Sequence, residues 1–434
     1  MRFSPLAAAV ALALSGLSLD ASAQDSRDQE IAALKAQVEA LVSRLDDLEQ
    51  RTEAQSDVNI DTAQAIETLA TSSAKVETKG GIKVTTADKK FEASLGGRIH
   101  FDSYMFNEDI ASVTNATEFR RARLTLAGKA YGWEYKMEQD FAAGTNLDGL
   151  RDLYIAKSFG TGNKITIGHF KPYRSMEELT SSNEILMMER PFSSATGLFG
   201  NRQFQQGVGY QKVGASYTAS VSAFNLRGAS GVRNEGTGVA GRFTWAPVNE
   251  ETKTFHLGGW FSVENTDEAT PNLVASVNYA GRRGPSLSVA TTPGISGDSV
   301  TAVGLEAAGS IGAFFFQSEY AQAKFGQTTG PDQDVSTFYV QGSWMLNGGH
   351  KPYKAAAGVF GGPKVEGKGL WELTARYDTI ENKDLVDRQA STWILGLNYY
   401  VNANMRIMAN YAQGDNDLTG DETGQFALRT QFAF

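Results

Sequence analysis

The sequence predicts an all-β protein: a 16-stranded antiparallel transmembrane β-barrel with an N-terminal α-helical coiled-coil segment. Three observations predict the barrel. Apolar and polar residues alternate along many short segments, short and long connections alternate between those segments, and aromatic residues gather near the segment ends. Bacterial outer-membrane barrels share all three features, because their strands face lipid on one side and water on the other.

The last ten residues show the alternation most clearly. One face of the stretch from Gln425 to Phe434 carries Phe426, Leu428, Thr430, Phe432 and Phe434, and the other carries Ala427, Arg429, Gln431 and Ala433. A period of two is the pattern of a β-strand with two different faces. The stretch therefore predicts a wall strand that is apolar outside and polar inside.

The front of the chain predicts export. Residues 1–23 combine Arg2, an apolar segment and the small-residue sequence Ala21-Ser22-Ala23, which is typical of a secretory signal peptide. After this segment no run of ~18 apolar residues occurs, which excludes a helical integral membrane protein. The 434 residues contain no cysteine, so disulfides and thiolate metal sites are also excluded.

Residues 24–56 change to a heptad pattern. Apolar residues follow 3-4 spacing at Ile31, Leu34, Val38, Leu41, Leu45 and Leu48. Such a seam predicts a coiled coil, and an isolated amphipathic helix of this length needs a partner. We expect self-association in the periplasm. Residues 57–90 are polar and are expected to form a linker.

The barrel is expected from residue 91 to residue 434. Sixteen alternating segments are predicted as strands: 91–105, 121–130, 133–140, 150–158, 164–170, 204–210, 214–225, 237–246, 253–264, 300–309, 312–324, 335–346, 370–379, 391–400, 403–412 and 425–434. The number is even, as bacterial single-chain barrels require. Short turns alternate with long loops, except that 347–369 is long on the short-turn side.

Aromatic residues predict the edges of the membrane. Residues of outward parity near the strand ends are Trp133, Trp245, Trp344, Trp371, Trp393 and Tyr411. Such girdles mark the two interfaces between membrane and water. Outer-membrane lipid is therefore an expected partner, and nucleic acid is not.

One long loop carries a recognisable series of motifs. It begins Gly168-His169-Phe170-Lys171-Pro172-Tyr173 and continues through Glu178-Leu179-Thr180-Ser181-Ser182 to Glu189-Arg190-Pro191. With Phe119-Arg120-Arg121-Ala122-Arg123-Leu124, Ala246-Pro247 and Leu370-Trp371-Glu372-Leu373-Thr374-Ala375-Arg376-Tyr377, it resembles the phosphate-selective porin O and P family. The resemblance covers residues 91–434 and implies a homotrimer of 16-stranded porins in the outer membrane of a Gram-negative bacterium, with the coiled coil in the periplasm.

The resemblance also implies a pore narrowed by inward loops, among them 347–369. Basic side chains in such a passage attract anions. The residues expected at the constriction or in anion binding are Arg190, Arg120, Arg121, Arg123, Lys171, Lys351 and Lys354. Phosphate-selective members place a lysine before the Thr-Ser-Ser run, whereas this chain has Leu179, which cannot coordinate an oxyanion.

Charges of inward parity give a mixed wall. Nine are positive: Arg98, Arg121, Arg123, Lys129, Lys136, Arg242, Arg376, Arg406 and Arg429. Eleven are negative: Glu92, Asp102, Glu134, Glu138, Asp140, Asp152, Glu264, Glu306, Glu319, Glu372 and Asp378. Selectivity is therefore expected to come from the inward loops, and each wall charge is expected to pair with a neighbour.

Other site chemistry finds little support. Gly362–Lys368 matches a P-loop pattern only until Gly369, and the stretch from Asp415 resembles a calcium loop until Phe426. The histidines His100, His169, His256 and His350 show no metal spacing, so no metal, cofactor or catalytic residue is expected.

The predicted function is passive diffusion of small hydrophilic solutes or inorganic anions, phosphate or polyphosphate among them, through an outer-membrane porin. Two alternatives stay open. One is a channel for uncharged solutes such as sugars, with Tyr173, Phe192 and Phe199 as an apolar track. The other is a non-channel barrel, whether enzyme or adhesin, whose loops plug the lumen.

Overall fold

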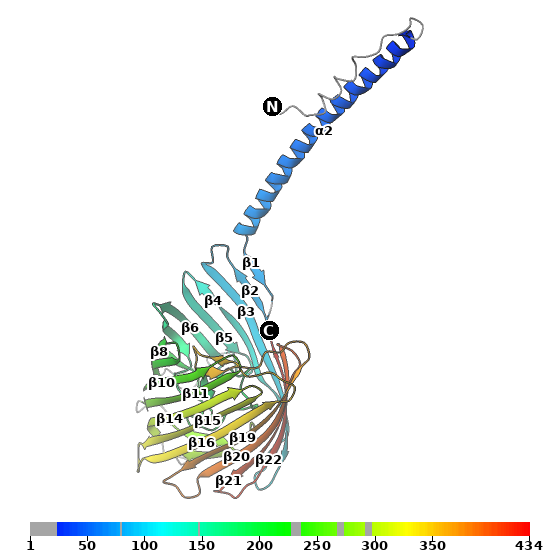
Figure 1. The fold of residues 1–434 in the computed structure, drawn as a ribbon. Coiled ribbons are helices and arrows are strands. Elements are labelled where there is room, and N and C mark those ends of the chain that lie inside the picture. The colour runs from blue at the N-terminus through cyan, green and yellow to red at the C-terminus, as the bar shows by residue number, and fades with distance from the viewer. Residues whose placement is uncertain (1–23, 79, 146–147, 227–235, 267–272, 291–296) are drawn as a thin grey trace. The chain divides into compact units, whose positions relative to one another are not determined.

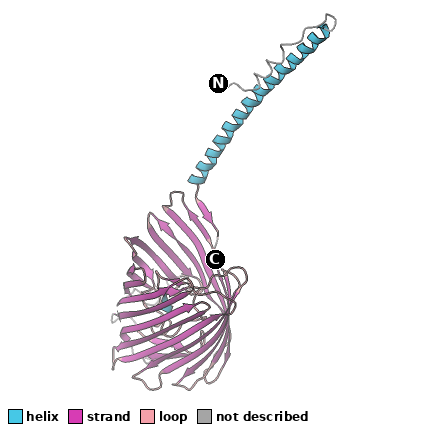
Figure 2. Ribbon diagram, in the orientation of Figure 1, coloured by secondary structure: helices cyan, strands magenta, loops and turns pink. Residues whose placement is uncertain are grey.

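The computed structural model describes residues 24–78, 80–145, 148–226, 236–266, 273–290 and 297–434, so the predicted signal peptide lies outside the described residues. The chain divides into two compact units, Met1–Ser73 and Ala74–Phe434. Figures 1 and 2 show the helix of the first unit and the sheet of the second. Among the described residues, no helix has the length and apolar character needed to cross a membrane.

The first unit contains one long helix, α2 (Gln24–Ser72). Glycine and proline are absent from this stretch, so nothing in its sequence interrupts the helix. The helix confirms the helical part of the heptad prediction, but the predicted linker at 57–90 is wrong in its first part. Residues 57–72 are helical, and they continue the same heptad frame through Asn59, Thr62, Ile66 and Leu69. Four polar seam residues, Thr52, Gln55, Asn59 and Thr62, hid this continuity.

The rest of the predicted linker is also structured. Strands β1 (Lys75–Glu77) and β2 (Ile82–Thr85) form a hairpin, and β2 pairs with the first residues of β3 through Ile82–Leu95. Alternation over three or four residues is too short to distinguish a strand from a polar loop. The hairpin brings the chain to β3 at its short-turn end.

All sixteen predicted wall segments are strands. Eighteen strands form one sheet, and without β1 and β2 sixteen remain. They are β3 (Phe91–Asn107), β4 (Ala116–Ala130), β5 (Trp133–Asp140), β6 (Leu150–Phe159), β7 (Asn163–Phe170), β8 (Gln205–Val213), β9 (Tyr217–Asn225), β10 (Gly236–Asn249), β11 (Lys253–Thr266), β14 (Gly297–Ile311), β15 (Phe314–Gln327), β16 (Gln333–Met345), β19 (Leu370–Asn382), β20 (Gln389–Tyr400), β21 (Met405–Asn416) and β22 (Gly424–Ala433).

The sheet closes on itself where the last strand meets the first. β22 pairs antiparallel with β3 from Gly424–Asn107 to Ala433–Arg98, and Phe434 and Gly97 exchange backbone hydrogen bonds of 2.8 and 3.0 Å. In Figure 1 the red end of the ribbon accordingly lies beside the cyan strand β3. Closure leaves no free edge in the wall, which is what a sheet in a bilayer requires.

The two faces of the wall follow the sequence pattern. In β22 the side chains of Phe426, Leu428 and Phe432 are exposed on the outside, whereas Arg429 is buried inside. The predicted girdle residues Trp133, Trp245, Trp344, Trp371, Trp393 and Tyr411 are all exposed. The sixth tryptophan, Trp260, faces inward and packs on Phe199.

The connections alternate as predicted. The turn between β4 and β5 has only Tyr131 and Gly132, both with positive φ (50° and 79°), the geometry of a two-residue hairpin turn that matches strand twist. The connection between β16 and β19 is the long exception and contains strands β17 (Tyr353–Lys354) and β18 (Val359–Phe360). It folds into the lumen, where Phe360 packs on Phe315 of the wall.

Three inward segments fill one side of the lumen. They are loop 171–204 (called loop 3 here) with its short helix α3 (Met176–Leu179), the hairpin β12 (Ala275–Asn278) to β13 (Ser286–Ala290), and the 346–369 turn. Figure 2 shows α3 as the short cyan helix among the strands. Buried apolar residues of loop 3 and the hairpin pack against β10–β20 and fill the lumen on that side. The remaining polar space lies along β3–β6.

Candidate functional site

Loop 3 is held by a wall carboxylate at its helix. Glu319 of β15 accepts hydrogen bonds from the backbone N–H groups of Met176 (3.1 Å) and Glu177 (2.9 Å) and from the Ser175 hydroxyl (3.2 Å). The first N–H groups of a helix have no partner within the helix, and a carboxylate satisfies them well. Glu319 therefore fixes where loop 3 crosses the lumen.

Other wall acids hold the same loop. Asp378 accepts from the Phe192 N–H at 2.9 Å, and Glu264 forms ion pairs with Arg174 and Arg202. Arg174 also stacks on Phe199, with its guanidinium carbon 3.6 Å from the ring centre. These acids anchor loop 3, and the charge of Glu264 is in addition balanced by its two arginines.

All eleven inward acids have a partner, as the sequence predicted. Their partners are Lys83 for Glu92, Arg429 for Asp102, Lys164 for Glu134, Arg98 and Arg123 for Glu138, Arg123 for Asp140, Lys136 for Asp152, Arg174 and Arg202 for Glu264, Arg242 for Glu306, loop 3 amides for Glu319, Lys351 for Glu372 and the Phe192 amide for Asp378. Ten of the eleven form an ion pair with a lysine or arginine, Asp378 with Arg376 at 3.9 Å among them, so most of the acid charge of the wall is balanced.

A β-bulge turns two consecutive arginines into the lumen. The register between β3 and β4 shifts between His100 and Phe101, so that His100 pairs with Arg121 and Phe101 with Phe119. Arg120 is the extra residue of the bulge, and bulges redirect side chains in this way. Phe119 faces outward, while Arg120 and Arg121 both reach the lumen.

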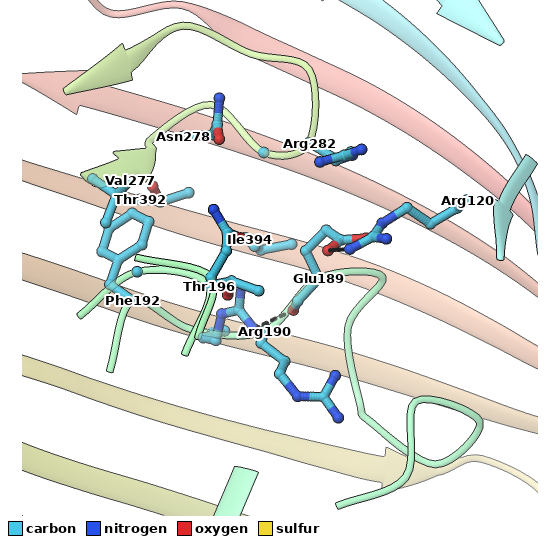
Figure 3. Close-up of a pocket in the computed structure, with 14 residues that line it drawn as sticks. Arg120, Glu189, Arg190, Phe192, Thr196, Val277, Asn278, Arg282, Thr392 and Ile394 are labelled. Carbon is cyan, nitrogen blue, oxygen red and sulfur yellow. Dashed lines mark hydrogen bonds and ion pairs between the residues drawn. The ribbon is translucent and has the colours of Figure 1, made fainter. Parts of the chain in front are cut away.

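Arg120 meets the end of loop 3. Its guanidinium makes two hydrogen bonds to the Glu189 carboxylate, at 2.8 and 2.9 Å, and Figure 3 shows this pair from the side of the pocket. Arg429 adds a third contact to Glu189 at 3.1 Å. Burial would raise the pKa of the Glu189 carboxyl, but the charges of Arg120 and Arg121 outweigh it and hold this pKa well below its usual range.

Arg121 differs from its neighbours. Its side chain is buried, and its guanidinium donates to Nδ1 of His100 at 3.3 Å. His100 in turn contacts Oδ1 of Asn183 in loop 3 through Nε2, at 3.0 Å. Among the described residues, no carboxylate forms an ion pair with Arg121.

Arg123 and Arg98 lie next along the same wall and share an acid. Glu138 binds Arg98 at 3.0 Å and Arg123 at 2.8 Å, and Asp140 also binds Arg123 at 2.8 Å. Arg98 donates as well to the hydroxyls of Ser181 and Ser182 in loop 3, at 3.3 and 3.0 Å. The predicted site residue Arg123 is therefore balanced by acids.

Arg190 braces loop 3 from within. Its Nε donates to the Glu177 carbonyl at 3.2 Å and its terminal nitrogen to the Thr180 carbonyl. The Arg190 side chain also lines the two adjoining cavities. Arg190, the arginine predicted at the constriction, thus contributes a positive charge and also stabilises the conformation of loop 3.

Lys171 stands at the start of loop 3. Its ammonium lies 3.7 Å from the Glu178 carboxylate and 5.5 Å from the ring centre of Phe204. Burial, with a second contribution from the charge of Arg190, lowers the pKa of Lys171 to about 7 despite the opposing charge of Glu178. Its charge is therefore sensitive to pH near neutrality.

The two predicted turn lysines do not present free charges. Lys351 is buried and binds Glu372 at 3.0 Å, and Lys354 binds Glu184 of loop 3 at 2.5 Å. Their role in attracting anions stays a prediction, and these ion pairs reduce the charge available for it. Sequence parity could not reveal the ion pairs, because the partners are 21 and 170 residues away in the chain. Instead, the pair Lys354–Glu184 ties the turn to loop 3.

A cavity of about 510 Å³ opens on the long-loop side of loop 3. The charged residues in its lining are eight arginines and three acids: Arg120, Arg121, Arg123, Arg151, Arg190, Arg202, Arg282 and Arg283, with Glu118, Asp148 and Glu189. A smaller pocket of about 90 Å³ adjoins it beside Phe192, Val277 and Arg282 (Figure 3). Six of the eight arginines bind carboxylates, whereas Arg121 and Arg190 form no ion pair with a carboxylate of the described residues.

A second cavity, of about 310 Å³, lies at the short-turn end and is lined by Arg98, Asn183 and Phe434. Arg121 borders the first cavity, Arg98 and Asn183 border the second, and His100 contacts both Arg121 and Asn183. The polar group Arg121, His100, Asn183 and Arg98 therefore separates the two cavities. We call this group the narrow zone.

Several charged residues of the mouth were not predicted. Arg282 and Arg283 come from the β12–β13 hairpin and bind Glu118 of β4, the former at 3.0 Å. Arg202 lies at the end of loop 3. An adjacent arginine pair in a long loop was the available signal, but nothing local showed that this loop folds inward.

The predicted apolar track is not formed. Phe192 and Phe199 are buried in the apolar cluster between loop 3 and the wall, and Tyr173 packs against Phe170 at 5.8 Å. Leu179 packs beside the second cluster, with Met176, Val359 and Phe360. Leu179 thus contributes to the packing of loop 3.

Comparison with known proteins agrees with the fold. A family model described as phosphate-selective porin O and P matches residues 94–434. Porin O of Pseudomonas aeruginosa is 29% identical over 406 residues, which cover 83% of this chain and 92% of that protein. A protein of Caulobacter vibrioides is 25% identical over 455 residues, covering 94% of this chain and 90% of its own.

Solved structures share the architecture. An anion-selective porin from Comamonas acidovorans superposes with a TM-score of 0.53 at 14% identity, over 79% of this chain and 99% of its own. A loop-deletion mutant of OmpT from Vibrio cholerae gives 0.52 at 14% identity, over 80% and 100%. At a sequence identity of 14%, the similarity to these two structures is evidence for a shared fold alone.

A closed 16-stranded barrel with aromatic rims and an inward loop defines an outer-membrane porin. Within that class, the chain belongs to the phosphate-selective porin O and P family, whose model covers the whole wall from the first strand to the terminal phenylalanine.

Proposed function

We propose that this porin passes small hydrophilic solutes down their gradient with a preference for inorganic anions. One observation carries the proposal: the mouth is lined by eight arginines against three acids, and two of these arginines, Arg121 and Arg190, form no ion pair with a carboxylate of the described residues. A narrow passage with low-dielectric walls strengthens the effect of such an imbalance on a permeating ion. Anions are therefore enriched and cations depleted at the mouth.

Specific binding of phosphate is not part of this proposal. Leu179 is packed in an apolar cluster and offers no donor to an oxyanion. Phosphate and polyphosphate are expected to permeate as anions among others.

The reversal potential of purified protein in planar bilayers under a salt gradient tests the proposal. An anion-preferring channel gives a potential of the sign set by chloride, and its magnitude falls when salt rises, because screening shortens the reach of the charges. A reversal potential set by the cation would contradict the proposal. Folded protein without single-channel current would favour a plugged, non-channel barrel.

We further propose a homotrimer in the outer membrane, surrounded by lipid at its exposed apolar face and carrying the helix α2 in the periplasm. The chain enters the barrel at the short-turn end of β3, and short turns face the periplasm in bacterial barrels. The trimer rests on the membership of the family, and the heptad seam of α2 supports self-association without specifying the number of chains.

The charges beside the seam support parallel, in-register helices. With Ile31 at position a, Glu30 and Arg44 occupy g positions, and Lys35 and Glu49 occupy the e positions five residues later. In a parallel coiled coil such g and e residues of neighbouring helices meet, and both pairs are of opposite charge. Asn59 at an a position adds a polar layer that disfavours shifted registers.

The seam alone does not specify three strands. Ile31 and Val38 at a positions with leucine at d favour two strands in an isolated coil. In this proposal the barrels set the number of helices, and the coil adds stability to the assembly. Chemical crosslinking of the full-length protein in detergent tests the trimer: a dominant monomer at all protein concentrations would contradict it.

A further inference from the structure

We propose that His100 is a specificity-determining positioning residue: a neutral group that holds the Arg121 guanidinium in the narrow zone and leaves its charge unbalanced. The inference rests on the proposed anion preference and assigns that preference to a particular pair. The arginines of the wall differ in the kind of group that they bind. Arg98, Arg123 and Arg429 each bind a carboxylate, whereas Arg121 binds an imidazole.

Burial makes this asymmetry important. Arg121 has only 4% of its surface exposed and His100 none. A buried guanidinium needs a hydrogen-bond acceptor, and a carboxylate is the usual one. A carboxylate at position 100 would cancel the charge of Arg121, whereas a neutral imidazole accepts the hydrogen bond and keeps it.

The hydrogen bonds of His100 determine which tautomer the neutral imidazole adopts. Nδ1 of His100 accepts from Arg121, so the proton of the neutral ring is on Nε2, which then donates to Oδ1 of Asn183 at 3.0 Å. Asn183 belongs to loop 3, whose backbone carbonyl at this residue also accepts from Gln431 at 3.1 Å. One histidine thus connects the wall arginine to the loop that narrows the pore.

The surroundings favour the neutral ring. The Arg121 guanidinium lies at Nδ1 of the ring. An imidazolium would face this positive charge with a second one and would lose the acceptor that Arg121 uses. The arrangement therefore needs an uncharged acceptor with a donor on its other side.

His100→Gln supplies such a group, because a glutamine amide can accept with its oxygen and donate with its nitrogen. We expect this variant to keep the anion-to-cation permeability ratio of the natural protein. His100→Glu supplies a carboxylate instead. We expect it to lower the ratio by about fourfold or more, since a unit charge ~5 Å from an ion in water changes its occupancy by roughly that factor.

Two further variants complete the experiment, which measures reversal potentials of the full-length protein in planar bilayers. Arg121→Gln removes the charge itself and should lower the ratio as far as His100→Glu. Gln211→Glu is the matched control: it adds the same negative charge to the inner wall at the short-turn end of β8, where Gln211 contacts Ala356 and not Arg121. It should change the ratio less than His100→Glu.

The outcomes distinguish the contribution of Arg121 to selectivity from the role of His100. If the natural protein shows no anion preference, or if Arg121→Gln leaves the ratio unchanged, the assignment of selectivity to Arg121 fails. If Arg121→Gln lowers the ratio but His100→Glu does not, the role of His100 is overturned. Equal losses in His100→Gln and His100→Glu also overturn it, because neutrality would then be irrelevant. Resistance of each folded barrel to unfolding by detergent at room temperature confirms that the variants are compared in the same fold.

Discussion

Single residues in the lumen act through pairing more than through their own charge. Arg123, Lys351 and Lys354 are each bound by a nearby carboxylate, while Arg121 is bound by a neutral ring. The opposite charges of a close ion pair largely cancel at distances greater than their separation, because the Coulomb terms have opposite signs. Counting charges along a strand therefore misjudges a pore, and counting unpaired charges describes it better.

Lys171 gives a prediction on pH. A lysine is charged only when protonated, and the pKa of Lys171 is lowered to about 7, so the passage carries one positive charge more below this pH than above it. We expect the anion-to-cation permeability ratio to fall as pH rises from about 6 to about 8. Lys171→Arg stays charged throughout and should remove the dependence, as should Lys171→Gln at a lower ratio. An unchanged pH profile in both variants would contradict the assignment.

Arg190 gives a prediction that separates charge from bracing. Arg190→Ala removes the charge and two hydrogen bonds to loop carbonyls, and charge-assisted hydrogen bonds are worth about 1.5–3 kcal/mol each. We expect a lower anion preference and larger current fluctuations in single-channel records. Arg190→Lys keeps the charge without the paired geometry. It should keep the preference and still raise the fluctuations; quiet records from both variants would show that Arg190 does not brace the loop.

At the scale of elements, wall strands and inward loops form one structure. Glu319, Asp378 and Glu264 hold loop 3, and Lys354–Glu184 ties the turn to it. Apolar residues of loop 3 pack on Phe360 of the same turn. We therefore expect loop 3 to be rigid, because three elements support one another.

Glu319 tests this support. Glu319→Ala leaves the first amides of α3 and the hydroxyl of Tyr339 without their acceptor, and a buried unsatisfied donor costs about 1–3 kcal/mol. We expect loop 3 to loosen and single-channel conductance to rise. Glu92→Ala is the control, because Glu92 pairs with Lys83 near the short-turn rim and has no contact with loop 3. Equal conductance in both variants and the natural protein would refute the anchoring role.

The helix offers a charge-exchange test of its orientation. Arg44→Glu places like charges at the paired g and e positions of parallel helices and should lower the melting temperature of the assembled protein. Adding Glu49→Arg should restore it, since the pair is again of opposite charge. The double variant would remain as unstable as the single one if the helices do not lie parallel and in register.

At the scale of the whole molecule, assembly and conduction are expected to be separable. Deleting residues 29–50 removes the apolar seam from Ile31 to Leu48 and leaves the closed sheet intact. We expect a lower melting temperature of the trimer with unchanged conductance and ion preference, measured by heated gel mobility and planar bilayers. The paired substitutions Ser43→Asp and Gln50→Asp at f positions, away from the seam, serve as the control. A trimer that melts unchanged after the deletion would assign the helix to another partner.

The sequence by itself determined the wall. Strand positions, the inward and outward faces, the aromatic rims and the alternation of connections all follow from local patterns of period two, which the backbone enforces residue by residue. The heptads likewise determined the helix, although four polar seam residues led to an end placed too early and to a linker where the structure has helix and a hairpin.

Only the tertiary structure decided what the lumen charges do. The bulge that turns Arg120 inward, the ion pairs that occupy Lys351 and Lys354, and the imidazole that leaves Arg121 unbalanced depend on residues brought together across the ring. Loops are placed by packing and by long-range pairing, for which no local period exists. The position of a strand follows from the alternation of its own residues, whereas the effect of a charged residue in the pore depends on the group that it binds.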